Sequence, residues 1–94
     1  MNNANEKAAI RPVLPAHGYY APLLKKVKRK VLDYIQARTE KSQGTSLRWL
    51  RGEVRPTTPA ERKVVADALK KYAGCTLTGD ELFPEDFPYT GAHN

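Results

Sequence analysis

The sequence predicts an all-α fold, a small bundle of four to five short helices without a sheet. Apolar residues recur at helical spacing in two long segments, and no stretch beyond four residues alternates between apolar and polar side chains as a half-buried strand does. With 94 residues, the chain has room for one compact core. We therefore expect one helical domain over residues 22–84, between an N-terminal arm over 1–21 and an acidic-aromatic tail over 85–94.

The N-terminal arm is expected to be extended, because its prolines and glycine, among them Pro15 and Gly18, interrupt the hydrogen bonding of a regular helix. Four of its side chains are too apolar for a free linker: Val13, Leu14, Tyr19 and Tyr20. Part of the arm should therefore lie against the domain.

The first predicted helix begins at Pro22, since proline suits the first helical position. Its apolar stripe consists of Leu23, Leu24, Val27, Val31, Tyr34 and Ile35. Five of the six positions from 25 to 30 carry cations: Lys25, Lys26, Lys28, Arg29 and Lys30. Two interpretations remain open, a solvated face or a surface that contacts phosphates, and the scarcity of interleaved acids keeps the second in view.

A short second helix is expected from about Ser46 to Arg51. Residues 39–45 before it contain no large apolar side chain and predict a turn. Gly52 after it is the residue best suited to the left-handed conformation that ends many helices.

The third helix has the clearest start, because Thr58 and Glu61 form a capping box and Pro59 takes the first helical position. Gly74 is its expected stop. One more short turn of helix is expected over residues 78–83, immediately before Pro84.

Charge divides the chain into a basic body and an acidic end. The formal net charge is +6, but residues 11–74 hold fifteen bases against five acids. No Lys or Arg follows residue 74, and the last twenty residues carry four acids: Asp80, Glu81, Glu85 and Asp86. Such a body predicts an acidic partner.

Several classes of protein are excluded. No nucleotide-binding, hydrolase or metalloprotease motif is present, so an enzyme is not expected. The single Cys75 cannot form an internal disulfide and predicts a structural thiol, while isolated His17 and His93 offer no metal-ligand spacing. We expect no cofactor and no small-molecule substrate. With no apolar run of membrane-spanning length and no signal peptide, the protein should be cytoplasmic, without a membrane partner.

The segment over residues 42–56 resembles the second half of the helix-turn-helix of lambda-Cro and lambda-repressor-like phage regulators. In that family a recognition helix carrying Trp or Ile ends at a glycine, and basic residues and a proline follow. The matching residues here are Trp49, Gly52, Arg55 and Pro56. The helix around residues 64–69 looks like the family's fourth helix, and residues 81–84 resemble the segment after it. The resemblance covers roughly residues 22–84.

The first half of the motif departs from the family pattern, in either of two registers. When the motif is aligned on Gly52, Glu40 stands where the family has the glycine of the tight turn. Gln36 then replaces the usual small residue before that glycine, and Ser46 takes the first buried position of the recognition helix. When the alignment is shifted by one residue, Ala37, Leu47 and Leu50 fall at apolar positions of the motif, and Lys41 stands where the turn glycine is expected. Both registers turn Leu50 inward and Arg48 outward.

The resemblance implies a sequence-specific double-stranded DNA-binding transcriptional regulator of phage or mobile-element type, acting as a homodimer, with a recognition helix over about residues 43–51 in the major groove. Arginine forks bond guanine bidentately and glutamine bonds adenine. The candidates for base contacts are Gln43, Thr45, Arg48 and Arg51. Basic side chains elsewhere would hold phosphates. The candidates for phosphate contacts are Lys25, Lys26, Lys28, Arg29, Lys30, Lys41 and Arg55.

Two other classes of function stay open. The basic face would also suit a protein-binding module, such as an antitoxin or an inhibitor of a host factor, or an RNA-binding protein. Each singled-out residue has a structural interpretation as well: Trp49 as a core side chain, Arg48 and Arg51 as solubilising charges. In the tail, Phe87 and Tyr89 are expected to be disordered, to contact a second subunit or to shield the basic face.

Overall fold

The computed structural model describes residues 12–91, and five helices account for their regular structure. These are α2 (Pro15–Tyr20), α3 (Lys25–Thr39), α4 (Gln43–Arg51), α5 (Pro59–Ala73) and α6 (Gly79–Leu82). No strand occurs within this described range, so the predicted all-α class is confirmed. The expectations for residues 1–11 lie outside it.

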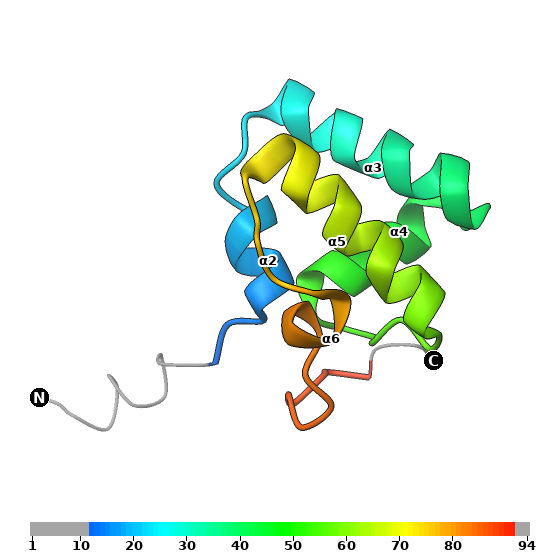
Figure 1. The fold of residues 1–94 in the computed structure, drawn as a ribbon. Coiled ribbons are helices and arrows are strands. Elements are labelled where there is room, and N and C mark those ends of the chain that lie inside the picture. The colour runs from blue at the N-terminus through cyan, green and yellow to red at the C-terminus, as the bar shows by residue number, and fades with distance from the viewer. Residues whose placement is uncertain (1–11, 92–94) are drawn as a thin grey trace, which may run out of the picture.

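Helix α5 is the centre of the arrangement (Figure 1). It packs against α3, α6 and α2, while α4 packs against α3 and α2 on the other side of the core. The same view shows α3 lying across one end of the molecule, with α6 and the chain after it at the opposite end.

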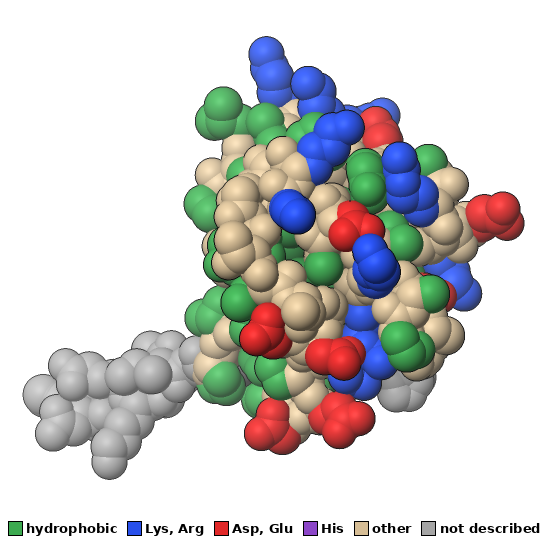
Figure 2. Space-filling view, viewed as in Figure 1, with side chains coloured by type: hydrophobic (Ala, Val, Ile, Leu, Met, Phe, Trp, Pro, Cys, Tyr) green, Lys and Arg blue, Asp and Glu red, His purple; other side chains and the backbone are tan. Residues whose placement is uncertain are grey.

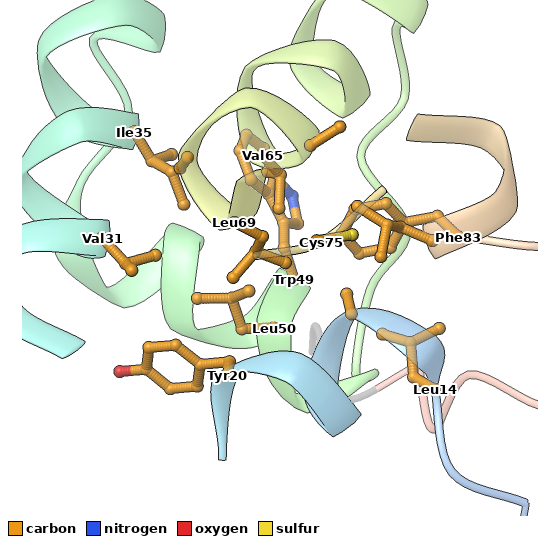
Figure 3. Close-up of a cluster of buried hydrophobic side chains, with 14 of the residues drawn as sticks. Leu14, Tyr20, Val31, Ile35, Trp49, Leu50, Val65, Leu69, Cys75 and Phe83 are labelled. Atoms are coloured by element: carbon orange, nitrogen blue, oxygen red, sulfur yellow. The ribbon is translucent and has the colours of Figure 1, made fainter. Parts of the chain in front are cut away.

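The hydrophobic core draws on every helix and on the segments that connect them (Figure 3). Its fully buried side chains include Leu14, Val31, Ile35, Leu50, Val65, Leu69, Cys75, Leu82 and Phe83. Trp49 is 4% exposed and lies in the same cluster, as its structural interpretation predicted. The thiol of Cys75 also lies in the core. The Leu77 amide donates to its sulfur at 3.3 Å, and the thiol lies 4.0 Å from the Leu77 carbonyl oxygen.

The arm was expected to contain no regular helix, and for residues 15–20 this prediction was wrong. Pro15 takes the first helical position of α2, where no backbone donor is needed, so the proline starts the helix instead of preventing it. Burial of Leu14, Ala16 and Tyr20 holds this short helix on the domain, which confirms that part of the arm lies against it.

Helix α3 begins at Lys25, three residues after the predicted start. Pro22 belongs instead to the turn after α2, where the Leu23 amide donates to the Tyr20 carbonyl at 3.1 Å. Leu24 is the residue before the helix, and it is 72% exposed although it was expected in the apolar stripe.

Helices α5 and α6 have the predicted boundaries. Both begin with a complete capping box, formed by Thr58 with Glu61 and by Thr78 with Glu81. Gly74 ends α5 at φ 68°, in the left-handed conformation expected for that position. No helix in the part of the chain that the structure describes combines the length and apolar character needed to cross a bilayer.

Candidate nucleic-acid interface

Helices α3 and α4 are joined by a three-residue turn, residues 40–42. Glu40 caps α3 with φ 60°, and its amide donates to the Gln36 carbonyl at 2.9 Å. Within residues 12–91, Glu40 is the one non-glycine residue with positive φ. The backbone therefore adopts at Glu40 the conformation that glycine adopts without strain, as the register anchored at Gly52 implied and the register shifted to Lys41 did not.

Helix α4 starts at Gln43, three residues earlier than its periodicity predicted. The Ser42 hydroxyl caps the helix by accepting a hydrogen bond from the Thr45 amide at 3.1 Å. Serine is a strong N-cap signal in any sequence, but here it stands in a segment without large apolar side chains, so the residue pattern alone predicted a turn. The range of about 43–51 that the resemblance implied has the bounds of the observed helix.

The inward face of α4 fixes the helix on the core. Ser46 and Leu50 are fully buried, and Trp49 is nearly so. The Ser46 hydroxyl is satisfied by donating to the Ser42 carbonyl at 3.2 Å. Trp49 is thus a packing residue, and the surface that α4 offers to a partner is on the other side.

The outward face of α4 carries arginines and no carboxylate. Arg48 and Arg51 are exposed and lie three positions apart, so they share one side of the helix, with Gly44 one turn before Arg48. A Cβ built at Gly44 would have only the Ser42 hydroxyl within 4 Å, at 3.8 Å, so no other side chain covers the helix backbone at this position. Arg51 Nη1 lies 3.7 Å from Glu53 Oε2, beyond the end of the helix.

The two other base-contact candidates lie in the first turn of α4. Gln43 is exposed, while Thr45 is half-buried and its hydroxyl accepts from Ser42 Oγ at 3.1 Å. Gln43 is thus available to a partner, whereas Thr45 is engaged in the cap.

The cations of α3 are mostly exposed. Lys25, Lys26 and Lys30 form no ion pair with the described residues, and Arg29 Nε lies 3.7 Å from Asp33 Oδ1 one turn along the helix. Lys28 differs: it is half-buried, with Nζ 5.4 Å from the centre of the Tyr20 ring. The space-filling view shows basic side chains around α3 and acidic side chains gathered at the α6 end (Figure 2).

Two phosphate candidates have intramolecular partners. Lys41 Nζ lies 3.7 Å from Glu61 Oε2. Arg55 Nε donates to the Phe83 carbonyl at 2.7 Å, and its guanidinium lies 4.0 Å from Asp80. Arg55 ties the segment after α4 to α6, so a phosphate would have to compete with these partners for it.

Sequence reasoning did not single out Arg62, which stabilises the same region. It is 8% exposed, its Nε donates to Asp80 Oδ1 at 2.9 Å, and its Nη1 donates to the Pro56 carbonyl at 2.8 Å. A signal was present: Arg62 precedes Val65 by three positions and Ala66 by four, and so falls on the buried stripe of α5.

The C-terminal tail packs on the end of α4. Phe87 lies so close to Gly52 that a Cβ there would come within 3.2 Å of its ring. The Thr90 and Gly91 amides donate to the carbonyls of Gly52 and Glu53 at 3.2 and 2.8 Å. Of the three expectations for the tail aromatic residues, disorder was wrong, because they pack on the chain's own domain.

Comparisons with known proteins find no protein-family model, no curated protein and no solved structure that matches this chain. The fold and this surface therefore define the protein by themselves: a small all-α domain whose helix α4, reached through a three-residue turn from a cation-rich helix, presents arginines on its outward face.

Proposed function

We propose that this protein is a sequence-specific double-stranded DNA-binding transcriptional regulator of phage or mobile-element type, which acts by binding and not by catalysis. The observation that carries the proposal is the unit formed by α3, the turn at Glu40 and α4. Two helices joined by a three- to four-residue turn, with the second helix in the major groove, are the DNA-binding helix-turn-helix arrangement.

The outward residues of α4 have the chemistry that base edges require. Arg48 can bond guanine O6 and N7 bidentately, and Gln43, in the first turn of the helix, can bond adenine. Recognition helices contact bases chiefly through their N-terminal residues. Gly44 between these two side chains supports a close approach of the helix backbone to the groove.

The exposed cations of α3 supply the affinity that does not depend on sequence. Lys25, Lys26 and Lys30 are exposed on the helix that precedes α4. Each phosphate neutralised by such a lysine releases a counterion, so binding should weaken steeply as salt rises.

We also propose that the protein binds as a homodimer, because one short helix reads only a few base pairs. A symmetric operator with half-sites about 34–36 Å apart would result. Light scattering of the free protein and of its DNA complex measures the stoichiometry, and a complex of one chain per duplex would contradict this part of the proposal.

The experiment that tests the function is a selection of bound duplexes from a random library, followed by titrations of the selected and a scrambled duplex. Arg48→Ala should weaken binding to the selected duplex by about 1–3 kcal/mol and leave the scrambled duplex little changed. Lys26→Ala removes the same charge from α3 and should weaken both duplexes alike.

Three outcomes would contradict the proposal. The first is no binding to any duplex in low salt. The second is a preference for RNA hairpins or single strands over duplex DNA, which would favour an RNA-binding protein. The third is stoichiometric co-purification of an acidic protein without nucleic acid, which would favour a protein-binding module.

A further inference from the structure

Three helices meet at Tyr20, the last residue of α2. Its ring is buried, with 8% of the residue exposed, but its hydroxyl points away from the hydrophobic cluster (Figure 3). Lys28 of α3 places Nζ 5.4 Å from the ring centre. Arg51 is the last residue of α4, the helix that packs against α2. Burial raises the pKa of Tyr20 above its ordinary value, and the positive charge of Arg51 opposes the rise.

The polar groups at this junction are not satisfied by one another. The Tyr20 hydroxyl makes no hydrogen bond to any residue in the range 12–91, and Lys28 forms no ion pair there. The Arg51–Glu53 separation of 3.7 Å is about 1 Å longer than a charge-assisted hydrogen bond, so the guanidinium keeps donors for another acceptor.

We propose that Tyr20, Lys28 and Arg51 together bind one phosphate group, which on the proposed function is a backbone phosphate of the DNA beside the groove that α4 enters. A phenolic hydroxyl, an ammonium and a guanidinium can all donate hydrogen bonds, and the last two carry positive charge, which suits an oxyanion with several acceptor oxygens. This part of the proposal rests on the proposed function only for the source of the phosphate.

The assignment changes the role of Arg51. The residue was a candidate for a base contact, but it is the last residue of α4, whereas recognition helices contact bases chiefly through their N-terminal residues. On this proposal Arg48 reads sequence, and Arg51 holds the far end of the helix at the backbone, against α2 and α3.

The test is Tyr20→Phe, which keeps the buried ring and removes only the hydroxyl. Its affinity for both the selected and the scrambled duplex should fall roughly tenfold, because a hydrogen bond to a charged acceptor is lost. Tyr19→Phe is the matched control and should bind as the wild type does. Arg51→Gln should weaken both duplexes alike and lower the slope of log K against log salt by about 1.

Failure of the site and failure of the proposed function give different results. If wild-type protein binds duplex DNA and Tyr20→Phe binds equally well, the site is wrong and the function stands. If Arg51→Gln weakens only the selected duplex, Arg51 contacts a base and the site is likewise wrong.

A titration with inorganic phosphate tests the site in the case where no duplex is bound. If no duplex is bound, but phosphate shifts the NMR signal of the Arg51 side chain in wild-type protein and not in Tyr20→Phe, the phosphate site stands and the DNA source is wrong. If phosphate shifts neither protein and no duplex is bound, both proposals are overturned.

Discussion

The two ends of this molecule use charge in opposite ways. At the α6 end, charged groups hold the structure together: Arg62 is buried against Asp80 at 2.9 Å, and Arg55 donates to the Phe83 carbonyl at 2.7 Å. At the α3–α4 end, the ion pairs of Arg29 and Arg51 are 3.7 Å long, and both arginines are exposed. Arginines that are largely buried and make short contacts are structural, whereas exposed arginines with long contacts are available to a partner. Substitutions at the two ends should therefore affect different measurements.

The largest expected effect is that of Arg62→Ala at the α6 end. The change leaves the Pro56 carbonyl without its donor and empties a buried site, so unfolding in urea should show a loss of about 3 kcal/mol. Lys63→Ala is the control, because Lys63 is an exposed neighbour whose partner Asp67 is partly exposed, and its cost should stay under about 0.5 kcal/mol. Equal losses for the two variants would break the comparison.

Gly79→Ala should have the next largest effect, again on stability. A Cβ at Gly79 would lie 2.7 Å from the backbone of Arg62, so α6 would have to move away from α5. Overpacking of this kind costs about 2 kcal/mol. In contrast, Gly18→Ala in α2 meets nothing within 4 Å and should stabilise the protein by about 0.5 kcal/mol, measured in the same urea titration.

At the α3–α4 end, Glu40→Gly should raise stability by about 0.5–1 kcal/mol, because relief of the left-handed strain exceeds the added entropy of the unfolded chain. Glu40→Ala removes the same charge and keeps a Cβ, so it should not share the gain. If thermal unfolding shows the same gain for both variants, charge and not backbone conformation limits stability at this turn.

The smallest expected effect on stability is that of Asp33→Asn. Its pair with Arg29 is exposed on both sides, so unfolding should change by less than about 0.5 kcal/mol. Affinity for duplex DNA in low salt should rise slightly, because Arg29 loses an intramolecular partner. A clear loss of stability with unchanged DNA affinity would place Arg29 among the structural charges.

Local signals made part of this fold predictable from the sequence. The capping box at Thr58 and the glycine stops at Gly52 and Gly74 are each complete within four residues, and these boundaries are confirmed. The short helix expected before Pro84 is also present, but the capping box at Thr78 that begins it was not singled out. Helix α2 was missed because its stability comes from burial of Leu14, Ala16 and Tyr20 in a core formed by distant segments.

The partners of the structural arginines could not be predicted from the sequence for a similar reason, although the helical spacing of Arg62 indicated its burial. Arg55 finds its acceptor 28 residues away and Arg62 finds Asp80 18 residues away, so neither partner is visible in a local pattern. The outward position of Arg48 needed only helical spacing, and it was predicted in both registers.

Position 52 meets two independent requirements, and they limit which amino acids it tolerates. Its φ of 81° disfavours any side chain, and the Phe87 ring would stand 3.2 Å from a Cβ. Gly74 meets only the first requirement, at φ 68° with open space around it. In a library that randomises both positions, we expect folded variants to have glycine or asparagine at position 74. At position 52 we expect only glycine, unless residue 87 changes at the same time.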